Sequence, residues 1–349
     1  MNKKIKTGII GFGKMGRIRK KVIENNPDLL LEGICDPVPS LQDDDVKCKF
    51  FKNYQDLLNL DIDAVFVCTP NKFTPEIVIS ALNNKKHVFC EKPPGRNLDD
   101  VHSIIKAEKK NNELKLKFGF NHRYHDNVME AKSIIDRGRS GKILWMRGVY
   151  GKSGGVNFEK MWRSNREIAG GGILLDQGIH MVDLFRTFCG DFQEVKSFVT
   201  NSYWDRDVEN DVFAILRNKK NQIAMLHSSS TQWKHTFSLE ISLEEGYVNL
   251  YGILSSTRSY GQGERLVTAR KQFENESFAV GNPQENLAYF SQDKSWEREI
   301  EDFVDCIKND KKITVGSSKD ALKTMELVYK IYSADSKWFN KMKSYENGG

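Results

Sequence analysis

The chain has no long uninterrupted run of apolar residues within its 349 positions. A membrane-spanning helix needs about 18 such residues in succession, so no segment is expected to cross a membrane. The apolar stretch after Lys3, Lys4 and Lys6 is broken by glycines and is too short for a signal peptide. Apolar residues make up 39% and charged residues 29% of the sequence, as in soluble globular proteins. We therefore expect a cytoplasmic protein.

Cysteine pairs at metal-binding or redox spacing are also missing, because no two cysteines form a C-x-x-C pattern. Four of the six fall in or at the ends of predicted buried strands, where reduced thiols pack as small apolar groups. Neither a disulfide framework nor a zinc site is expected. The six positions are Cys35, Cys48, Cys68, Cys90, Cys189 and Cys306.

Blocks of one charge are absent too, since 53 lysines and arginines are mixed with 47 acidic residues along the chain. That pattern argues against a nucleic-acid partner. The net charge of +6 suits an anionic small molecule, although a solvated surface is the more ordinary explanation. At 40.1 kDa, the chain is long enough for two domains that each bury a core.

A strand over residues 4–10, a glycine-rich turn and a helix over residues 14–25 are predicted to open the chain. In the G-x-G-x-x-G spacing, Gly11 permits a sharp turn, Gly13 lets a pyrophosphate approach the backbone, and Gly16 lets helix and strand pack closely. The helix N-terminus adds free N–H groups for the phosphates. These features predict a dinucleotide-binding turn rather than an ordinary one. Its residues are Gly11, Phe12, Gly13, Lys14, Met15 and Gly16.

A second strand over residues 29–35 ends at Asp36, which stands about 20 residues on, where such folds place the acid that holds a ribose 2′-hydroxyl. A carboxylate there repels a 2′-phosphate. Pro37, Val38 and Pro39 supply no cation to accept one. The sequence therefore predicts NAD as the cofactor, with NADP less favoured.

Strands and helices continue to alternate as far as residue 121. The strand over residues 64–68 is apolar on both faces, as in the middle of a parallel sheet covered by helices. Thr74 is expected to cap the next helix, with Pro75 at its first position. We predict a doubly wound Rossmann sheet of six strands over residues 1–121, with its ligand crevice at the C-terminal ends of the strands. The other strands are predicted at residues 46–51, 87–90 and 114–120, and the other helices at residues 53–60 and 99–111.

Beyond residue 121, strands joined by short turns replace this alternation, so we predict an α+β domain over residues 122–349 with a large, mostly antiparallel sheet. Residues 255–293 are polar and are expected to form a long surface excursion. Two helices, at residues 296–308 and 318–333, are expected to close the chain, and they are candidates to pack back on the first domain. The predicted strands span residues 143–150, 194–202, 212–217, 222–229, 236–243 and 247–251, after a helix at residues 127–137.

Two further stretches carry residue types suited to chemistry. Glu91, Lys92 and Pro93 follow the predicted strand at residues 87–90, at the rim where a nicotinamide lies if the first strand holds the pyrophosphate. Three glycines at residues 170–172 precede a stretch of helical spacing. Within it, Asp176 and His180 are predicted to project from one face, one turn apart.

With the glycine turn, these residues make the chain resemble the glucose-fructose oxidoreductase / inositol dehydrogenase / rhizopine catabolism (Gfo/Idh/MocA) family. The resemblance extends to at least residue 185, and Ser333 resembles a further family position. The residues that carry it, besides the glycine turn, are Cys68, Thr69, Pro70, Asn71, Glu91, Lys92, Pro93, Trp162, Arg163, Gly170, Gly171, Gly172, Asp176 and His180.

This resemblance implies a Rossmann domain followed by an open-faced mixed α/β domain, whose sheet commonly forms the interface of a homodimer or homotetramer. It also implies NAD(P)-linked oxidation or reduction at a sugar or cyclitol carbon. The lysine, the aspartate and the histidine would occupy the catalytic places, which here are Lys92, Asp176 and His180. The cofactor would also contact Thr69, Pro70, Asn71, Glu91 and Lys92.

The same three residue types suit alcohol oxidation, in which a hydride leaves carbon for the nicotinamide while a base removes the hydroxyl proton. Histidine changes protonation state near neutral pH and therefore suits that base. We hypothesise that His180 accepts the proton, that Asp176 holds the substrate or tunes the histidine, and that Lys92 donates to the developing alkoxide. Lys92 could itself be the base if burial favoured its neutral form, and the sequence leaves both assignments open.

Each motif also has an ordinary explanation. A lysine before a proline is commonly a loop residue, and an aspartate and a histidine four apart are commonly a surface pair. The latter spacing also suits zinc, although no further histidine or cysteine stands at ligand spacing nearby, so no metal is expected. The glycines at residues 170–172 fit a flexible loop, or else a close approach of the backbone to a substrate.

Arginine and aromatic side chains flank the same stretches. Arg123 and Tyr124 follow the predicted sixth strand, and Trp162, Arg163 and Arg166 precede the glycines. Guanidinium groups bind phosphates or carboxylates, and aromatic faces suit sugar rings. These residues suggest an anionic substrate such as a nucleotide-linked sugar, unless the arginines are only surface residues.

The sequence thus predicts an NAD-dependent dehydrogenase of a sugar, a sugar derivative or a cyclitol. A regulator that kept the fold and the dinucleotide site but lost catalysis is one alternative. A reductase of a non-sugar double bond, like the related biliverdin reductases, is another. The presence of Lys92, Asp176 and His180 together argues against both.

Overall fold

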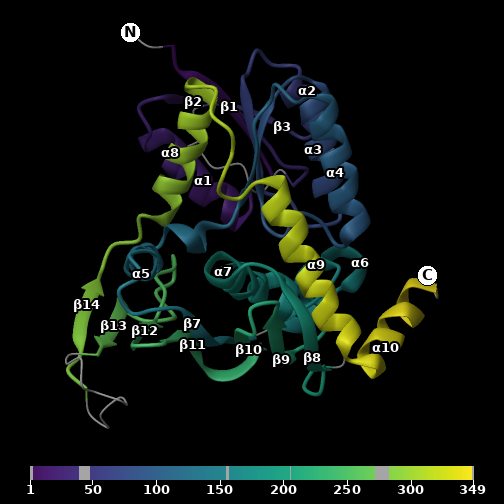
Figure 1. The fold of residues 1–349 in the computed structure, drawn as a ribbon. Coiled ribbons are helices and arrows are strands. Elements are labelled where there is room, and N and C mark those ends of the chain that lie inside the picture. Colours follow the sequence, from purple (N-terminus) through teal and green to yellow (C-terminus); the bar gives the residue numbers. More distant parts are fainter. Residues whose placement is uncertain (1–2, 39–47, 155–156, 205, 272–282, 348–349) are drawn as a thin grey trace. The chain divides into compact units, whose positions relative to one another are not determined.

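The computed structural model describes residues 3–38, 48–154, 157–204, 206–271 and 283–347, and Figure 1 shows its helices and strands. The chain divides into two compact units. The first unit consists of Met1–Asn121, Glu167–Gly170 and Trp296–Lys323, and the second unit consists of His122–Arg166, Gly171–Ser295 and Thr324–Gly349.

The first unit is built on a six-stranded sheet with the order β3-β2-β1-β4-β5-β6, in which every pairing is parallel. The strand order reverses between β1 and β4, where such sheets place their ligand crevice. The predicted doubly wound sheet is confirmed. The strands are β1 (Ile5–Ile10), β2 (Leu29–Cys35), β3 (Lys49–Phe51), β4 (Ala64–Val67), β5 (His87–Glu91) and β6 (Leu116–Gly119). The helices are α1 (Lys14–Asn25), α2 (Tyr54–Leu58), α3 (Thr74–Asn83), α4 (Leu98–Lys110), α6 (Arg166–Ala169) and α8 (Ser295–Lys308).

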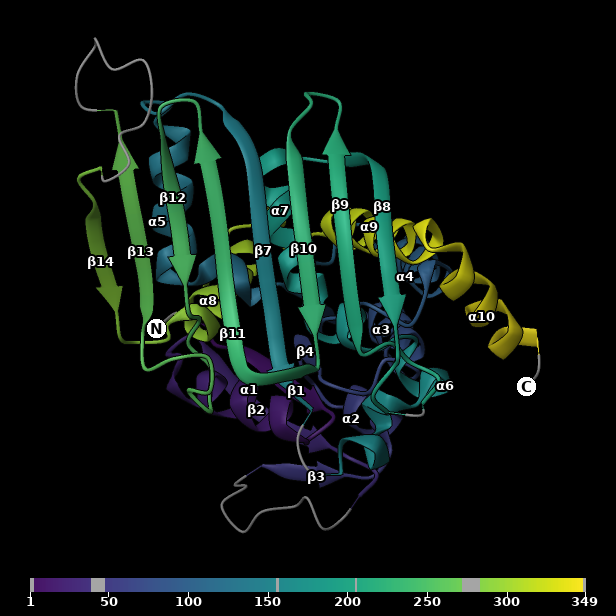
Figure 2. The same cartoon turned by 90° about the horizontal axis from the view of Figure 1, so that it is seen from below.

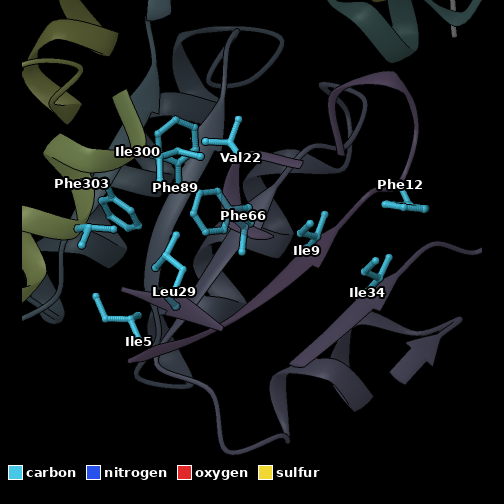
Figure 3. Close-up of a cluster of buried hydrophobic side chains, with 13 residues drawn as sticks. Ile5, Ile9, Phe12, Val22, Leu29, Ile34, Phe66, Phe89, Ile300 and Phe303 are labelled. Atoms are coloured by element: carbon cyan, nitrogen blue, oxygen red, sulfur yellow. The ribbon is translucent and has the colours of Figure 1, made fainter. Parts of the chain in front are cut away.

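The core of the first unit joins its sheet to α8, which comes much later in the chain, after most of the second unit (Figure 3). Phe66 and Phe89 stack with their ring centroids 5.3 Å apart, and Phe303 meets both rings edge-on. Ile300 lies on the same face of α8 and is fully buried. These apolar residues recur at helical spacing, and together they form the buried face of α8.

The second unit is built on an eight-stranded sheet with the order β14-β13-β12-β11-β7-β10-β9-β8. Among the strands that the structure describes here, only β10 and β7 pair in parallel, so the predicted mostly antiparallel sheet is confirmed. Its strands are β7 (Ile143–Ser153), β8 (Phe192–Thr200), β9 (Asp211–Asn218), β10 (Ile223–Ser229), β11 (Thr231–Leu243), β12 (Gly246–Tyr251), β13 (Glu264–Arg270) and β14 (Asn286–Phe290). Its helices are α5 (Asp126–Asp136), α7 (Ile179–Cys189), α9 (Ser318–Ala334) and α10 (Ser336–Asn347), with α9 beginning in the first unit. Short helical turns are η2 (Asn121–Tyr124), η3 (Phe158–Lys160), η4 (Trp162–Ser164) and the π-helical turn η5 (Leu174–Gly178).

One face of this sheet is covered by helices and the other is open. Figure 2 shows the strands side by side with α5 and α7 behind them. Strand β9 alternates accordingly: Val212 and Leu216 are fully buried, whereas Phe213 and Ile215 are about half exposed. The open face therefore carries apolar side chains that no part of the described unit covers.

Several sequence expectations are corrected. The strand expected at residues 46–51 is Lys49–Phe51, and residues 46 and 47 lie outside the described part. Residues 255–293 contain β13 and β14 as well as loops, because neither strand shows a clear alternation of apolar and polar residues. Residues 272–282 lie outside the described part. A third C-terminal helix, α10, follows α9. Thr74 is the first residue of α3 rather than its cap, which is Phe73.

Among the residues that the structure describes, none of the helices combines the length and the apolar character that a membrane crossing requires.

Candidate active site

The glycine turn between β1 and α1 has the geometry that its spacing predicts. Gly11 has a φ of +92°, and a Cβ there would lie 2.6 Å from the carbonyl oxygen of Cys68. A Cβ on Gly16 would lie 2.2 Å from the carbonyl oxygen of Gly11. At Gly13, by contrast, a Cβ would meet nothing within 4 Å. The chain is thus packed tightly on both sides of an open backbone position at the start of α1, which fits the approach of a pyrophosphate.

Asp36 follows β2 and binds the backbone of the glycine turn through its side chain. One carboxylate oxygen accepts the backbone N–H of Phe12 at 2.7 Å, and the other accepts that of Val38 at 2.9 Å. The side chain is therefore oriented by two backbone donors at the end of the strand. It is 7% exposed, and its carboxylate retains further lone pairs for a ribose hydroxyl.

The loop after β4 is held by a short segment from later in the chain. The Asn71 side-chain amide donates to the carbonyl of Ala169 at 2.6 Å, and the Lys72 N–H donates to the carbonyl of Ile168 at 3.0 Å. Thr69 contacts Thr74 through their hydroxyl groups, 3.1 Å apart. Thr69, Pro70 and Asn71 therefore form an ordered loop beside the glycine turn, because β4 pairs directly with β1.

Glu91 ends β5 and belongs to a buried charge cluster that the sequence does not reveal. Its carboxylate accepts the Nε–H of Arg19 at 2.7 Å, and Arg19 donates from Nη2 to Glu299 at 2.8 Å. Arg19 and Glu299 are both fully buried. The Arg19 guanidinium also lies 4.3 Å from the ring centroid of Phe89. One cation from α1 thus fixes a carboxylate on β5 and another on α8.

Burial makes Glu299 sensitive to pH, because it raises the pKa of this carboxyl to about 7, against the lowering effect of Arg19. An unfolded chain releases this proton at a lower pH, near the ordinary value of 4.5. Between pH 4.5 and about 7 the folded state therefore binds more protons than the unfolded state does. The contribution of Glu299 to the free energy of unfolding falls as the pH rises through this range.

Lys92 directly follows Glu91 and is half-buried. The peptide bond from Lys92 to Pro93 is cis. Because β1, β4 and β5 are parallel neighbours, Lys92 and the glycine turn lie at the same edge of the sheet, where the strands end. This is the placement that the sequence predicts for a residue next to the nicotinamide.

In the second unit, Asp176 lies in the π-helical turn η5 and contacts two cations. Lys152 donates to one carboxylate oxygen at 2.9 Å, and Arg163 donates to the other at 3.3 Å. Arg163 also stacks on Trp162, with its guanidinium carbon 4.3 Å from the ring centroid. Lys152, on β7, contacts Asp176 although no local motif in the sequence indicates this contact.

His180, in the first turn of α7, is 4% exposed and stacks on His122. His122 in turn contacts the hydroxyl of Tyr150 at 3.1 Å. Burial raises the pKa of Tyr150, and the charges of Tyr260 and Asp176 raise it further. Tyr260 packs against Tyr150 and donates to the side chain of Gln177 at 2.9 Å. Asp176 and His180 therefore border one group of aromatic and polar side chains in the second unit.

Only glycine fits at two positions before η5, because other atoms of the protein approach the backbone there. A Cβ on Gly172 would lie 2.1 Å from the carbonyl oxygen of Glu209, and a Cβ on Gly171 would lie 2.5 Å from the hydroxyl of Tyr332. The Glu209 carboxylate accepts the N–H groups of Gly172 and Leu174 at 2.8 and 3.0 Å. Packing within the protein, rather than an approach to substrate, thus explains these two glycines.

The other sequence-predicted substrate residues differ in their surroundings. Arg123 donates to both carboxylate oxygens of buried Asp183, at 2.7 and 2.5 Å, so its charge is matched inside the protein. Arg166 is 7% exposed, and its backbone N–H donates to Asp207 at 3.0 Å. Tyr124 ends η2 and is half-buried. Arg163 is more exposed than Arg123, with 38% of its side chain accessible against 12%.

Within the described ranges, no three histidine, cysteine, aspartate or glutamate side chains are grouped so that they could hold a metal ion. All six cysteines are free thiols, and burial raises the pKa of Cys35 and of Cys189 to about 12.

Comparison with known proteins agrees with this architecture. Residues 5–120 match the family model described as an oxidoreductase family with an NAD-binding Rossmann fold, and residues 128–249 match the Gfo/Idh/MocA C-terminal domain. The chain belongs to the Gfo/Idh/MocA family. The resemblance inferred from the motifs is therefore confirmed, and the first unit is its NAD(P)-binding Rossmann fold.

Relatives within the Gfo/Idh/MocA family include dehydrogenases. The chain is 30% identical over 195 residues to the uncharacterized oxidoreductase YrbE of Bacillus subtilis, covering 54% of this chain and 55% of that protein. It is 32% identical over 192 residues to the myo-inositol 2-dehydrogenase of Thermotoga maritima, again covering 54% and 55%. The matches thus span about half the length of these relatives. The solved structure of a levoglucosan dehydrogenase in complex with NADH is 21% identical, with a TM-score of 0.84 over 96% of this chain and 98% of that one, which shows the shared fold.

Proposed function

We propose that the protein is an NAD-dependent dehydrogenase that moves a hydride between the nicotinamide and a secondary alcohol or ketone carbon of a sugar, a sugar derivative or a cyclitol. The observation that carries this proposal is that a chain of this family retains a lysine at the end of β5 and an aspartate and a histidine at η5 and α7. Relatives named inositol and levoglucosan dehydrogenases support the substrate class.

In this proposal each residue of the candidate site has a distinct role in the reaction. The glycine turn and Asp36 hold the dinucleotide, which accepts the hydride when it is bound. His180 accepts the hydroxyl proton, Asp176 holds the substrate, and Lys92 donates to the oxygen as negative charge develops on it. The proposal requires Lys92 of the first unit and His180 of the second unit to act on the same alcohol.

The direct test follows the absorbance of reduced nicotinamide while the protein is incubated with NAD and a panel of sugars, cyclitols and nucleotide-linked sugars. We expect at least one member to be oxidised. Binding of NAD without turnover of any member, in either direction, would favour a regulator of the same fold. Turnover only of a conjugated double-bond substrate with NADH would favour a reductase.

The cofactor preference gives a sharper prediction. We expect NAD to bind more tightly than NADP, because the Asp36 carboxylate repels a 2′-phosphate. The Asp36→Ala variant should lose at least about tenfold in NAD affinity, since a pair of hydrogen bonds to a charged group is worth about 1.5–3 kcal/mol or more. The ratio of NAD affinity to NADP affinity should also fall.

Isothermal titration with NAD and NADP measures both affinities. Asp99→Ala, which removes an exposed carboxylate from the start of α4, is the matched control. Equal affinities of the wild-type protein for the two dinucleotides would contradict the assignment of Asp36.

The substrate side of the proposal includes anionic sugars. Lys152 and Arg163 place two positive charges against the single carboxylate of Asp176. This excess suits a phosphate or a carboxylate on the substrate. If no nucleotide-linked sugar raises the melting temperature of the protein, this part of the proposal fails.

We also propose that the open face of the eight-stranded sheet forms a homodimer or homotetramer interface. Its exposed apolar side chains include Phe198, Phe213, Ile215 and Met225, and such patches mark association surfaces. Replacing both Phe213 and Ile215 with glutamate should give monomers in sedimentation velocity, because charges on the patch cannot be buried without cost. Tyr203→Glu, at a 73% exposed loop position, should leave the mass unchanged. A wild-type protein that sediments as a monomer would rule out this interface.

A further inference from the structure

Two buried imidazole rings lie face to face in the second unit. The ring centroids of His122 and His180 are 3.7 Å apart and their planes differ by 11°. The two side chains are 6% and 4% exposed. His180 comes from α7, whereas His122 comes from η2, so the pair is created by the fold and not by a local motif.

The surroundings fix the ring of His122 on more than one side. The hydroxyl of Tyr150 lies 3.1 Å from its Nε2 atom, and the Phe237 ring packs edge-on with a centroid distance of 6.0 Å. His125 meets it at 78° with a centroid distance of 5.3 Å, and the Nδ1 atom of His125 lies 2.5 Å from the Glu264 carboxylate. Burial raises the pKa of Tyr150 well above its ordinary value, so this hydroxyl stays protonated near neutral pH.

We propose that His122 is a positioning residue for the proton acceptor, and that His122 and His180 take up protons as one coupled pair, which holds no proton before His180 accepts the hydroxyl proton and one proton afterwards. Two positive charges about 4 Å apart in a buried site repel strongly, so the second proton binds much more weakly than the first. Such a pair titrates in two separate steps that belong to both rings. This inference rests on the proposed dehydrogenase function only for its consequence in catalysis.

The stacked arrangement has a consequence for the reaction. When His180 takes the hydroxyl proton, the neutral ring of His122 presents its π face to the new cation, which is a favourable contact. The same ring keeps water away from one face of His180 and holds its plane. The titratable side chains around the pair in the second unit are Tyr150, Tyr260, His125, Glu264, Asp293 and Asp176.

Nuclear magnetic resonance titration of the histidine ring nitrogens tests the coupling without any turnover. We expect two protonation steps for the His122 and His180 pair that are at least one pH unit apart. In the His122→Phe and His180→Phe variants, the low step should vanish and the remaining ring should titrate once. His102→Phe, on the exposed side of α4, should change neither step. Independent titration of the two rings at nearly the same pH, unaltered by either variant, would overturn the coupling.

Kinetics tests the positioning role with a pair of variants. His122→Ala, which removes the stacked ring, should lower kcat at least tenfold with an unchanged KM for NAD. His122→Phe keeps a stacked ring and should recover most of this loss, but with a pH profile of kcat/KM that shows one ionisation fewer on the acid side. Equal kcat in all three proteins would overturn the role of His122. If the wild-type protein oxidises no substrate, the proposed function fails, while the titration still decides whether the rings are coupled.

Discussion

Replacing Lys92 with methionine is expected to lower kcat on the order of a thousandfold, because a hydrogen-bond donor to a developing alkoxide contributes about two to three orders of magnitude. Methionine matches the length of lysine but cannot donate a proton. The dissociation constant of NAD should change by less than about twofold, because the glycine turn and Asp36 supply the contacts to the dinucleotide. Steady-state kinetics and isothermal titration measure the two quantities.

The matched control is Lys106→Met, which makes the same replacement at an exposed position of α4. We expect wild-type kinetics for this variant. A Lys92→Met protein with normal turnover would show that Lys92 is only a loop residue.

Replacing Arg19 with methionine should lower the free energy of unfolding by about 3–5 kcal/mol, the usual cost of removing one partner from a buried ion pair. The reason is that Glu91 and Glu299 would then lose the cation that they share. Urea denaturation followed by circular dichroism measures the change. The loss should be greater at pH 8 than at pH 5. The pKa of Glu299 is about 7, so this carboxyl is mostly charged at pH 8 and mostly protonated at pH 5.

A double variant distinguishes lost charge pairing from lost packing. Arg19→Met combined with Glu299→Gln should recover part of the stability, since the added change removes one of the uncompensated charges. Lys21→Met, at an exposed position of the same helix, should have little effect. A double variant that is less stable than Arg19→Met alone would show that the charges are not the cause.

The local pattern of the sequence was sufficient for most of the first unit. Helix α1 (Lys14–Asn25) and strand β2 (Leu29–Cys35) have the predicted limits, because each is marked by an apolar period and by turn residues at its ends. The glycine turn could be predicted for the same reason: its geometry depends on residues that are adjacent in sequence.

The remainder depends on contacts between distant residues. Arg19 contacts Glu91 and Glu299, which lie 72 and 280 positions away. No periodic pattern in the sequence predicts such a cluster. His122 and Lys152 reach the candidate site by the same kind of distant contact. The edge strand β14 consists of one polar residue followed by four apolar or aromatic ones and is largely exposed, so it lacks the alternation of apolar and polar residues that identifies a strand.

The most direct measurement is a crystal structure of the protein with NAD and a substrate that it oxidises. We expect the Lys92 ammonium and a ring nitrogen of His180 both to lie within hydrogen-bonding reach, about 2.6–3.2 Å, of the reacting oxygen. If either side chain lies farther from that oxygen than one bridging water can span, the proposed roles of Lys92 and His180 are contradicted.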